Sequence, residues 1–521
     1  MQVTPRFMLR AIGLGLMVTQ ALPAFASPQA EPVEAPLDRR YLAVDTALHD
    51  TLEHITLDMK QARRTHELWR QFDAPWEEKH GLTLGALGRV IRDHEGRYRM
   101  YYELMHANAE RVTAVAFSED GIHWEKPALN LAPAIVDDPA SNLIAVSPPD
   151  DDEGRGLLDG KWYRGAHAFY DAHATTPDTR YKLVWRQGHD MYVASSKDGL
   201  RFVTHGRAVD YYADTCPSHF FDPRRDAYVI YGRVWLDKKN RPTVQDRLGA
   251  DGDPPARRGV VLHRSPAWDE VPWPEAMVKE VLIDPLDVFD DGGWTDIYTP
   301  NVQLYHDQYV ALPAVFFRRV LPDRTGTAGP IYPVFMHSAD GRHWTFPDKK
   351  HPIIHLEPHR LRTDEGMEAG MIFPASNILV HGEELRVYYA ARGYQHYADS
   401  PGSRDDVTYN LAVLRRDGFA SLRAHDTNPG LWRTPAITVP EEATTLHVNA
   451  DVAGELVVEL CDAESGNPIE GLTATDCIPY AGNDTKATVR WQSTGLDTVA
   501  GRTVYFSFHI ADGEIFSFWF D

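Results

Sequence analysis

The sequence is poor in cysteine, in positive charge and in long hydrophobic runs, and each shortage excludes a class of protein. Three cysteines in 521 residues are too few for a disulfide scaffold, although Cys461 and Cys477 are close enough in sequence to pair in an oxidising compartment. Cys216 is left over as an odd thiol. The formal net charge of −22 argues against nucleic acid or an anionic membrane surface as a partner.

Metal-binding spacings are also missing. The chain contains no C-x-x-C and no H-E-x-x-H sequence. We therefore predict no metal ligands and no cofactor, while a structural Ca²⁺ is left open. No internal stretch approaches the length of a transmembrane helix, so membrane insertion is not expected.

The N-terminus has the three parts of a secretory signal. Arg6 and Arg10 charge its start, a short apolar stretch follows, and Ala24-Phe25-Ala26 fits the small-x-small cleavage pattern. The apolar stretch is too short to span a bilayer. We predict that residues 1–26 are a signal peptide cleaved after Ala26, which places the mature protein in the periplasm or outside the cell. Residues 27–40, rich in Pro, Ala and Glu, are predicted to be a disordered lead-in.

What the sequence does have is one repeated pattern, S-x-D-G-x-x-aromatic. It occurs within residues 117–124, 195–202 and 337–344. An Asp-Gly pair indicates a tight hairpin, because glycine accepts a positive φ and the aspartate side chain caps its own turn. Each copy follows a tyrosine-rich run that suits a half-buried strand. Such strands and hairpins, recurring at long intervals, are typical of a β-propeller with irregular insertions.

The predicted fold is all-β, a five-bladed β-propeller over residues 41–422 followed by a β-sandwich over residues 430–521. Short alternating strands and a hundred-residue length favour the sandwich. Residues 41–59 are expected to close the propeller ring as a clasp. The blades are expected to begin near Trp76, Gly165, Asp214, Asp296 and Glu368.

Carboxylates stand at the expected entry to the first strand in four of the five blades. That strand lines the central channel, so its entry residues converge on one mouth. Crowded carboxylates cannot all ionise, which leaves one protonated as an acid and one charged, as glycoside hydrolysis requires. A single such residue is more often a turn cap, so the shared register carries the prediction. The predicted catalytic residues are Glu77, Asp214, Asp296 and Glu368.

Other residues near these entries are predicted to bind substrate. Aromatic rings can stack on sugar faces, and charged or imidazole groups can hydrogen-bond to hydroxyls. By contrast, the aspartates of the three Asp-Gly pairs are predicted to be structural. The predicted substrate-binding residues are Trp76, His167, His219, Trp294, Tyr298, Glu365, Arg392 and His396.

Between Trp76 and Leu422 the repeated hairpins resemble those of the five-bladed propeller glycosidases, glycoside hydrolase families 32 and 43. The likeness is closest to uncharacterised secreted bacterial proteins of the family-32-like type. The resemblance implies a base or nucleophile at Glu77, a helper at Asp214 and an acid at Asp296 or Glu368. The W-x-N-D-P, R-D-P and E-C motifs of family 32 are absent, so fructoside specificity is not predicted.

The leading hypothesis is an exported glycoside hydrolase acting on an oligo- or polysaccharide. A non-catalytic carbohydrate-binding propeller is the first alternative, and it requires no carboxylate pair. A glycoside phosphorylase is the second, and it requires a cationic phosphate site. Arg257-Arg258 and Arg318-Arg319 are interpreted as loop charges or as contacts to an acidic or sulfated sugar.

Overall fold

The computed structural model of the chain describes residues 33–34, 39–69, 74–106, 111–147, 164–187, 190–209, 217–237, 256–274, 281–290, 294–320, 327–357, 368–396, 407–425 and 429–521. The predicted signal peptide, Asp214, Cys216 and Glu365 lie outside these residues. Within them the regular structure is almost entirely β-strand, so the all-β prediction is confirmed. Helix is limited there to short segments, α1 (Pro75–Lys79), α2 (Pro285–Phe289) and 3-10 turns at Thr46–Leu48, Pro177–Thr179 and Leu496–Val499. None of the described helices is long and apolar enough to cross a membrane.

Most of the described strands fall into five antiparallel groups that follow the chain. The first group is β6 (Leu82–Arg92), β7 (Tyr98–His106) and β8 (Arg111–Ser118). The second is β10 (Arg164–Tyr170), β11 (Tyr181–Gln187), β12 (Asp190–Ser196) and β13 (Arg201–Val209), with β9 (Ala145–Ser147) parallel to β13. The third is β14 (Ser218–Asp222), β15 (Ala227–Leu236), β16 (Arg257–Ser265) and β17 (Val281–Ile283).

The fourth and fifth groups share a hydrogen-bonded sheet. The fourth is β18 (Thr295–Thr299), β21 (Ala314–Phe317) and β24 (Ile331–Pro333), with β19 (Val302–Tyr305), β20 (Gln308–Ala311) and β25 (Met336–Ser338) and the hairpin of β22 (Arg319–Val320) and β23 (Thr327–Ala328). The fifth is β26 (Met371–Pro374), β27 (Leu379–His381), β28 (Glu384–Arg392), β29 (Val407–Arg415) and β5 (Arg63–Trp69).

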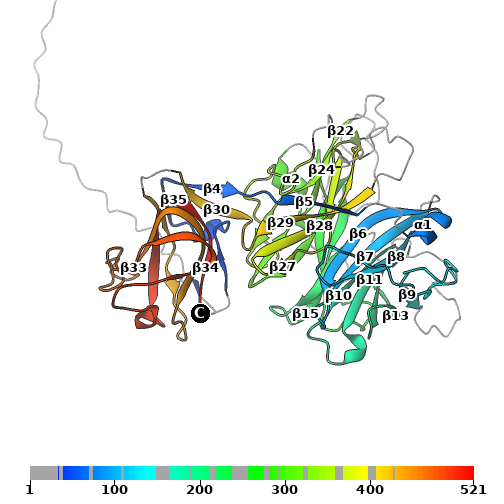
Figure 1. Ribbon diagram of the computed structural model, residues 1–521, viewed down its shortest axis with the longest axis horizontal. Helices are drawn as coiled ribbons and strands as arrows, with labels where there is room; N and C mark the ends of the chain where they lie inside the picture. The colour runs from blue at the N-terminus through cyan, green and yellow to red at the C-terminus, as the bar shows by residue number, and fades with distance from the viewer. Residues whose placement is uncertain are drawn as a thin grey trace, which may run out of the picture.

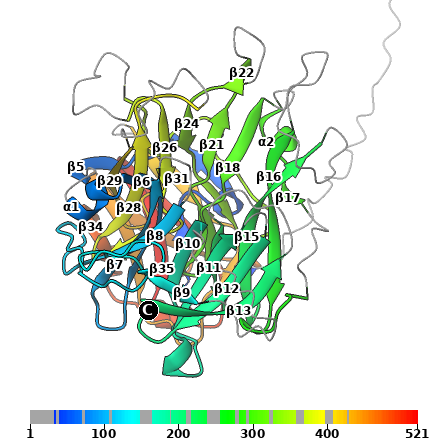
Figure 2. The ribbon, with the colours of Figure 1, turned by 90° about the vertical axis from the view of Figure 1, so that its right-hand side faces the viewer.

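These groups pack in a cyclic order through shared apolar cores. One core joins the first group to both the second and the fifth. Others join the second to the third, the third to the fourth and the fourth to the fifth. In Figure 2 the groups succeed one another around the view. Each group therefore buries its two faces against its neighbours, which explains why tyrosine, valine and leucine are so frequent along these strands.

The strand that closes this cycle is β5, one strand later than predicted. It precedes the first group in sequence and pairs antiparallel with β29 of the fifth group. Residues 41–59, expected to be the clasp, instead pair with the C-terminal part of the chain. The prediction was wrong because alternation alone identifies a strand without identifying its partner.

The repeated Asp-Gly pattern forms tight hairpins, as predicted. In the copy at residues 195–202, the Ser196 hydroxyl donates to Asp198 Oδ1 (2.9 Å) and accepts from the Gly199 N–H (2.9 Å). Asp198 Oδ1 also accepts the N–H groups of Leu200 (2.8 Å) and Arg201 (2.9 Å). The other two copies repeat these bonds. The three aspartates therefore cap their own turns.

Each hairpin is also held by the preceding strand group in the cycle. Tyr101 of β7 donates its hydroxyl to the Gly199 carbonyl (3.0 Å), and Arg99 donates to the Asp198 carbonyl. Tyr388 and Arg386 of β28 bind the hairpin at Gly121 in the same way, and Tyr231 with Arg225 binds the one at Gly341. The repeated pattern thus builds the contacts between groups, which the sequence did not reveal.

The C-terminal part forms a separate body beside the five groups (Figure 1). Its strands make one ten-stranded hydrogen-bonded sheet in which four N-terminal strands take part beside six C-terminal ones. They are β1 (Val33–Glu34), β2 (Tyr41–Leu42), β3 (Thr51–Glu53), β4 (Ile55–Met59), β30 (Ala420–Ala424), β31 (Gly430–Arg433), β32 (Ile437–Thr438), β33 (Leu446–Asp462), β34 (Tyr480–Val489) and β35 (Thr503–Phe520). Cys461 and Cys477 are both buried free thiols, so they do not form the disulfide considered from the sequence.

Asp417 joins this body to the strand groups. Its buried carboxylate accepts hydrogen bonds from Tyr305, in the fourth group, and from Ser517 of β35 (2.6 Å). Arg40 lies 3.8 Å from the same carboxylate and stacks on the Trp519 ring. Burial and the Asp417 charge raise the pKa of Tyr305 well above its usual range, so the phenol stays a donor.

Replacing Asp417 by alanine is therefore expected to destabilise the protein by about 2–4 kcal/mol, because two buried hydroxyls and a guanidinium lose their acceptor. Urea denaturation followed by tryptophan fluorescence measures this loss. Asp497→Ala, at an exposed turn of the same body, is the matched control and should change stability by less than about 0.5 kcal/mol. A loss no larger than that of the control would show that Asp417 does not couple the two bodies.

Candidate active site

The site centres on Asp296, in the first strand of the fourth group. Its carboxylate is fully buried. Arg258 of β16 approaches Oδ2 with its guanidinium (2.5 Å) and donates its backbone N–H to Oδ1 (3.0 Å). Arg318, which follows β21, lies 3.2 Å from Oδ1. Two buried guanidinium groups from two strand groups are thus held by one carboxylate.

Tyr298 and His396 lie next to this ion pair. The Tyr298 hydroxyl is 3.0 Å from His396 Nε2, and the two rings are 5.1 Å apart. The guanidinium groups of Arg233 and Arg258 lie 4.9 and 5.1 Å from the Tyr298 ring. Burial, followed by the charges of Arg258, Arg233 and Arg392, holds the pKa of His396 well below its usual range. The imidazole is therefore neutral and acts as a hydrogen-bonding group.

Aromatic rings also surround Arg258 and Tyr298. Trp235 lies 3.8 Å under the Arg258 guanidinium, and Phe316 and Phe373 approach Tyr298 at 6.3 and 5.5 Å. We call Asp296, Tyr298, His396, Arg233, Arg258 and Arg318 the mouth cluster. It combines cations, one carboxylate, a neutral imidazole and aromatic faces.

The arginines of the mouth cluster correct the sequence interpretation. Arg258 lies inside β16 and Arg318 directly follows β21, and both are buried. They are not the loop charges that Arg257-Arg258 and Arg318-Arg319 suggested. Because their partner Asp296 is distant in sequence, no local pattern pointed to this pairing. The one available signal was Arg257-Arg258, a pair of arginines at the start of an otherwise apolar predicted strand.

Arg89, His167 and His219 form a second group that ties three strand groups together. Arg89 of β6 donates to the His219 carbonyl (2.6 Å), and His219 Nε2 is 2.7 Å from the His167 carbonyl. Burial lowers the pKa of Arg89 to about 10 and that of His167 to about 4. Neither ring nitrogen of His167 has a hydrogen-bond partner among the described residues. Both predicted histidines are thus buried and in contact with each other.

Glu103 stands beside His167 and was missed by sequence reasoning. It accepts hydrogen bonds from the Gly165 N–H (2.7 Å) and from Arg111 (2.7 Å). Burial opposes its charge, but Arg111, His167 and the Gly165 N–H together lower its pKa to about 2. Glu103 lies on the second strand of its group, whereas the sequence prediction considered only the entries to first strands. Its signal was a charged residue within an apolar, tyrosine-rich strand.

Two other predicted catalytic residues, Glu77 and Glu368, are paired with cations from outside the mouth cluster. Glu77, on α1, pairs with Lys126 (2.9 Å) and accepts from Tyr102 (3.3 Å). Glu368 pairs with Arg64 of β5 and accepts from Tyr389 of β28 (2.9 Å). Burial raises the pKa of Glu368 although Arg64 opposes this effect. These partners of the two glutamates are therefore residues other than Asp296, Tyr298 and His396.

The structure also places the other residues that were predicted to bind substrate. Trp76 is buried on α1 beside Glu77. Trp294 precedes β18, and its carbonyl accepts from the Arg318 N–H (2.8 Å). Arg392 bonds to the Tyr394 hydroxyl and acts on His396 through its charge. The structure thus gathers Asp296, Trp294, Tyr298, Arg392 and His396 in one place. Among the described residues, no group of three or more His, Cys, Asp or Glu is arranged to hold a metal ion.

Acid is expected to destabilise the protein through His167. Its pKa is about 4 in the folded protein against an ordinary 6.5, so the folded state binds its proton more weakly than the unfolded state. The stability that the neutral His167 gives the folded state is fully present above about pH 6.5. It is lost as the pH falls to 4, which lowers the free energy of unfolding by about 3 kcal/mol. Glu103, with its lowered pKa, adds a loss of the same sign below about pH 4.5.

Urea unfolding at pH 7, 5.5 and 4 tests this expectation. The His167→Gln variant should show a shallower decline in stability between pH 6.5 and 4, because glutamine does not titrate. His425→Gln, an exposed histidine of the C-terminal body, serves as the control and should keep the wild-type slope. Equal slopes for the wild type and His167→Gln would contradict a buried neutral imidazole.

No protein-family model matches the chain, and no curated protein matches it. Among solved structures it is similar to a glycoside hydrolase, with 11% identity and a TM-score of 0.39 over 70% of this chain and 92% of that one. A thermostable family-43 glycoside hydrolase shows 16% identity and a TM-score of 0.37 over 64% and 89%. The catalytic domain of the Coprinopsis cinerea GH62 alpha-L-arabinofuranosidase shows 9% identity and a TM-score of 0.37 over 69% and 97%. Likenesses of this strength transfer no residue roles.

Proposed function

We propose that the protein is an exported glycoside hydrolase built on a five-bladed propeller, with its active site at the mouth cluster. In this proposal the five strand groups are the blades, and β6, β10, β14, β18 and β26 are their first strands. The observation that carries it is the convergence of Asp296, Tyr298 and His396 with aromatic rings and arginines at the entry of β18. Sites that bind sugars combine aromatic faces with a few fixed polar groups in this way.

The cluster supports a division of roles. Asp296 is fixed by Arg258 and Arg318, so it is the charged carboxylate of the proposed reaction and also orients both guanidinium groups. Tyr298 and the neutral His396 can exchange hydrogen bonds with sugar hydroxyls. The protonated acid of the pair remains a sequence prediction: Asp296 or Glu368 was named for it, and with Asp296 as the charged carboxylate the candidate is Glu368. Glu368 has the raised pKa that an acid needs, and its partners are Arg64 and Tyr389.

A screen of the mature protein against aryl glycosides and polysaccharides tests this function. We expect at least one substrate to be cleaved, and Asp296→Asn to lower kcat by several orders of magnitude while the fold is kept. Tyr298→Phe should raise KM more than it lowers kcat. Asp340→Asn, in the structural hairpin of residues 337–344, is the control that should leave kcat unchanged. If no glycoside in the screen is cleaved, the hydrolase proposal fails.

A carbohydrate-binding propeller without catalysis is the second candidate. It is favoured by the ion pairing of Glu77, Asp296 and Glu368, since each of these carboxylates already has a cationic partner. The arginines of the mouth cluster favour a phosphorylase as a third candidate, so the screen is repeated with inorganic phosphate. Binding without cleavage would identify the second candidate, and cleavage that depends on phosphate the third.

A further inference from the structure

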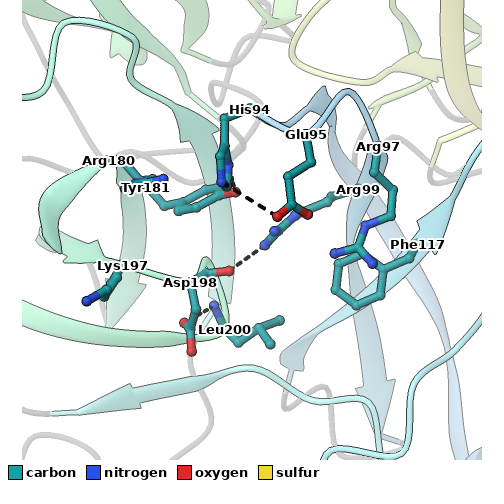
Figure 3. Close-up of a pocket in the computed structure, with 10 residues that line it drawn as sticks. All are labelled: His94, Glu95, Arg97, Arg99, Phe117, Arg180, Tyr181, Lys197, Asp198 and Leu200. Atoms are coloured by element: carbon teal, nitrogen blue, oxygen red, sulfur yellow. Dashed lines mark hydrogen bonds and ion pairs between the residues drawn. The ribbon is translucent and has the colours of Figure 1, made fainter. Parts of the chain in front are cut away.

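A cavity of about 430 Å³ opens between the first and second strand groups, away from the mouth cluster. Its walls are the turn that follows β6 and the Asp-Gly hairpin that follows β12, and its residues appear in Figure 3. The mouth cluster lies where β18 begins, whereas this cavity lies where β6 and β12 end. Successive first strands run in the same direction in a propeller, so the two places are on opposite faces.

Four cationic side chains line the cavity, in a protein whose net charge is −22. Arg97 and Arg99 come from the first group, and Arg180 and Lys197 from the second. Figure 3 shows the two pairs on facing sides, with Asp198 and Leu200 between them. A cavity of this size holds one or two sugar rings, within the range of small-ligand sites.

Four carboxylates lie near these four cations, and each is shared, held by its own turn or largely exposed. The buried Asp93 is shared, since its Oδ2 is 2.8 Å from Arg99 Nε and 3.8 Å from Arg97 Nε. The Asp198 carboxylate is occupied by the N–H groups of its own turn. Glu95 also lines the cavity, but it is largely exposed and lies 3.9 Å from His94. Lys197 pairs with Asp178 in a contact so exposed that it is weak.

The arginine planes are held in place by aromatic rings. Arg97 lies 4.3 Å over the Phe117 ring, and Arg99 lies between Phe117 (5.2 Å) and Tyr181 (4.6 Å). Among the described residues Arg180 makes no ion pair, and its Nε donates to the Pro177 carbonyl (3.0 Å). Fixed planar guanidinium groups bind carboxylate and sulfate oxygens in bidentate geometry.

We propose that this cavity is a second saccharide site, which binds the anionic group of an acidic sugar, a uronate carboxylate or a sulfate ester. The proposal rests on the proposed glycan function and deepens it, because it makes the substrate an acidic glycan held on the face opposite the active site. Arg97, Arg180 and Lys197 bind the anion, and Arg99 keeps the hairpin wall in place through the Asp198 carbonyl.

Isothermal titration calorimetry tests the proposal with four probes, a galacturonate tetramer, a sulfated oligosaccharide, sodium sulfate alone and a neutral cello-oligosaccharide. We expect one acidic oligosaccharide to bind and the neutral one to bind at least tenfold more weakly. The Arg180→Gln/Lys197→Gln variant should lose at least tenfold in affinity for the acidic probe. Arg207→Gln removes an exposed arginine of β13 outside the cavity and should bind like the wild type.

Three results would overturn the proposal. The acidic probes fail to bind, or the double variant binds them as the wild type does, or sodium sulfate alone binds as tightly as the sugars. The failures of the two proposals are distinguishable. Glycoside cleavage without binding in this cavity refutes the second site alone, whereas cavity binding without cleavage of any glycoside refutes the hydrolase alone.

Discussion

Replacing Asp296 by alanine is expected to destabilise the folded protein by about 3–5 kcal/mol, the range for breaking a buried ion pair from one side. The carboxylate is fully buried and is contacted by the guanidinium groups of Arg258 and Arg318. Alanine would leave both cations in a site of low dielectric without this partner. The substitution also removes a contact between two strand groups, because Arg258 belongs to the third group and Asp296 to the fourth.

Urea denaturation of wild type, Asp296→Ala and Asp296→Asn measures this effect. Asparagine keeps the side-chain volume and one acceptor oxygen, so it should lose less than alanine. Asp190→Ala removes a partly exposed carboxylate that lies 3.5 Å from Arg207, and it should lower the free energy of unfolding by less than about 1 kcal/mol. A loss below about 1 kcal/mol for Asp296→Ala would show that the two arginines do not depend on this carboxylate.

Replacing Gly199 by alanine is expected to lower the free energy of unfolding by about 3 kcal/mol. Gly199 has φ of +72°, and a Cβ there would lie 2.7 Å from both Arg99 Nη1 and the Tyr101 hydroxyl. A left-handed conformation costs an alanine about 1–2 kcal/mol. Displacing the arginine and tyrosine adds a further 1–3 kcal/mol, because both donate hydrogen bonds to this hairpin.

A second glycine separates the two contributions. Gly382 has a similar φ of +59°, but nothing lies within 4 Å of the position a Cβ would take. Gly382→Ala should therefore lose about 1–2 kcal/mol, from the backbone conformation alone. The difference in unfolding free energy between the two variants measures the contact between the first and second strand groups. Equal losses would mean that the contacts of Arg99 and Tyr101 with the hairpin add nothing to the free energy of unfolding.

The local features of the fold were predictable from the sequence. Asp-Gly pairs beside tyrosine-rich runs identified the hairpins, because turn chemistry is encoded within a few residues. The closing strand was placed one strand too early, since strand pairing depends on residues several hundred positions away. The Arg99–Asp198 and Tyr101–Gly199 contacts were invisible for the same reason.

The candidate site was predicted in part. Asp296 was predicted from its register at a strand entry, Tyr298 as an aromatic residue near that entry and His396 as a pocket histidine, and the structure brings them together. The buried partners Arg258 and Arg318 were misread as loop charges, because burial is not visible in two adjacent arginines. Glu77 precedes a first strand as expected, but α1 turns it toward Lys126. Register along the chain predicts which residues reach an entry but not where their side chains point.

The most direct test of the account is the rate of glycoside hydrolysis by Asp296→Asn beside the wild type, on whichever substrate the screen identifies. An active site at the mouth cluster predicts that kcat falls by several orders of magnitude while circular dichroism and the urea midpoint still report a folded protein. A folded Asp296→Asn variant that cleaves the substrate at the wild-type rate would contradict an active site at the mouth cluster.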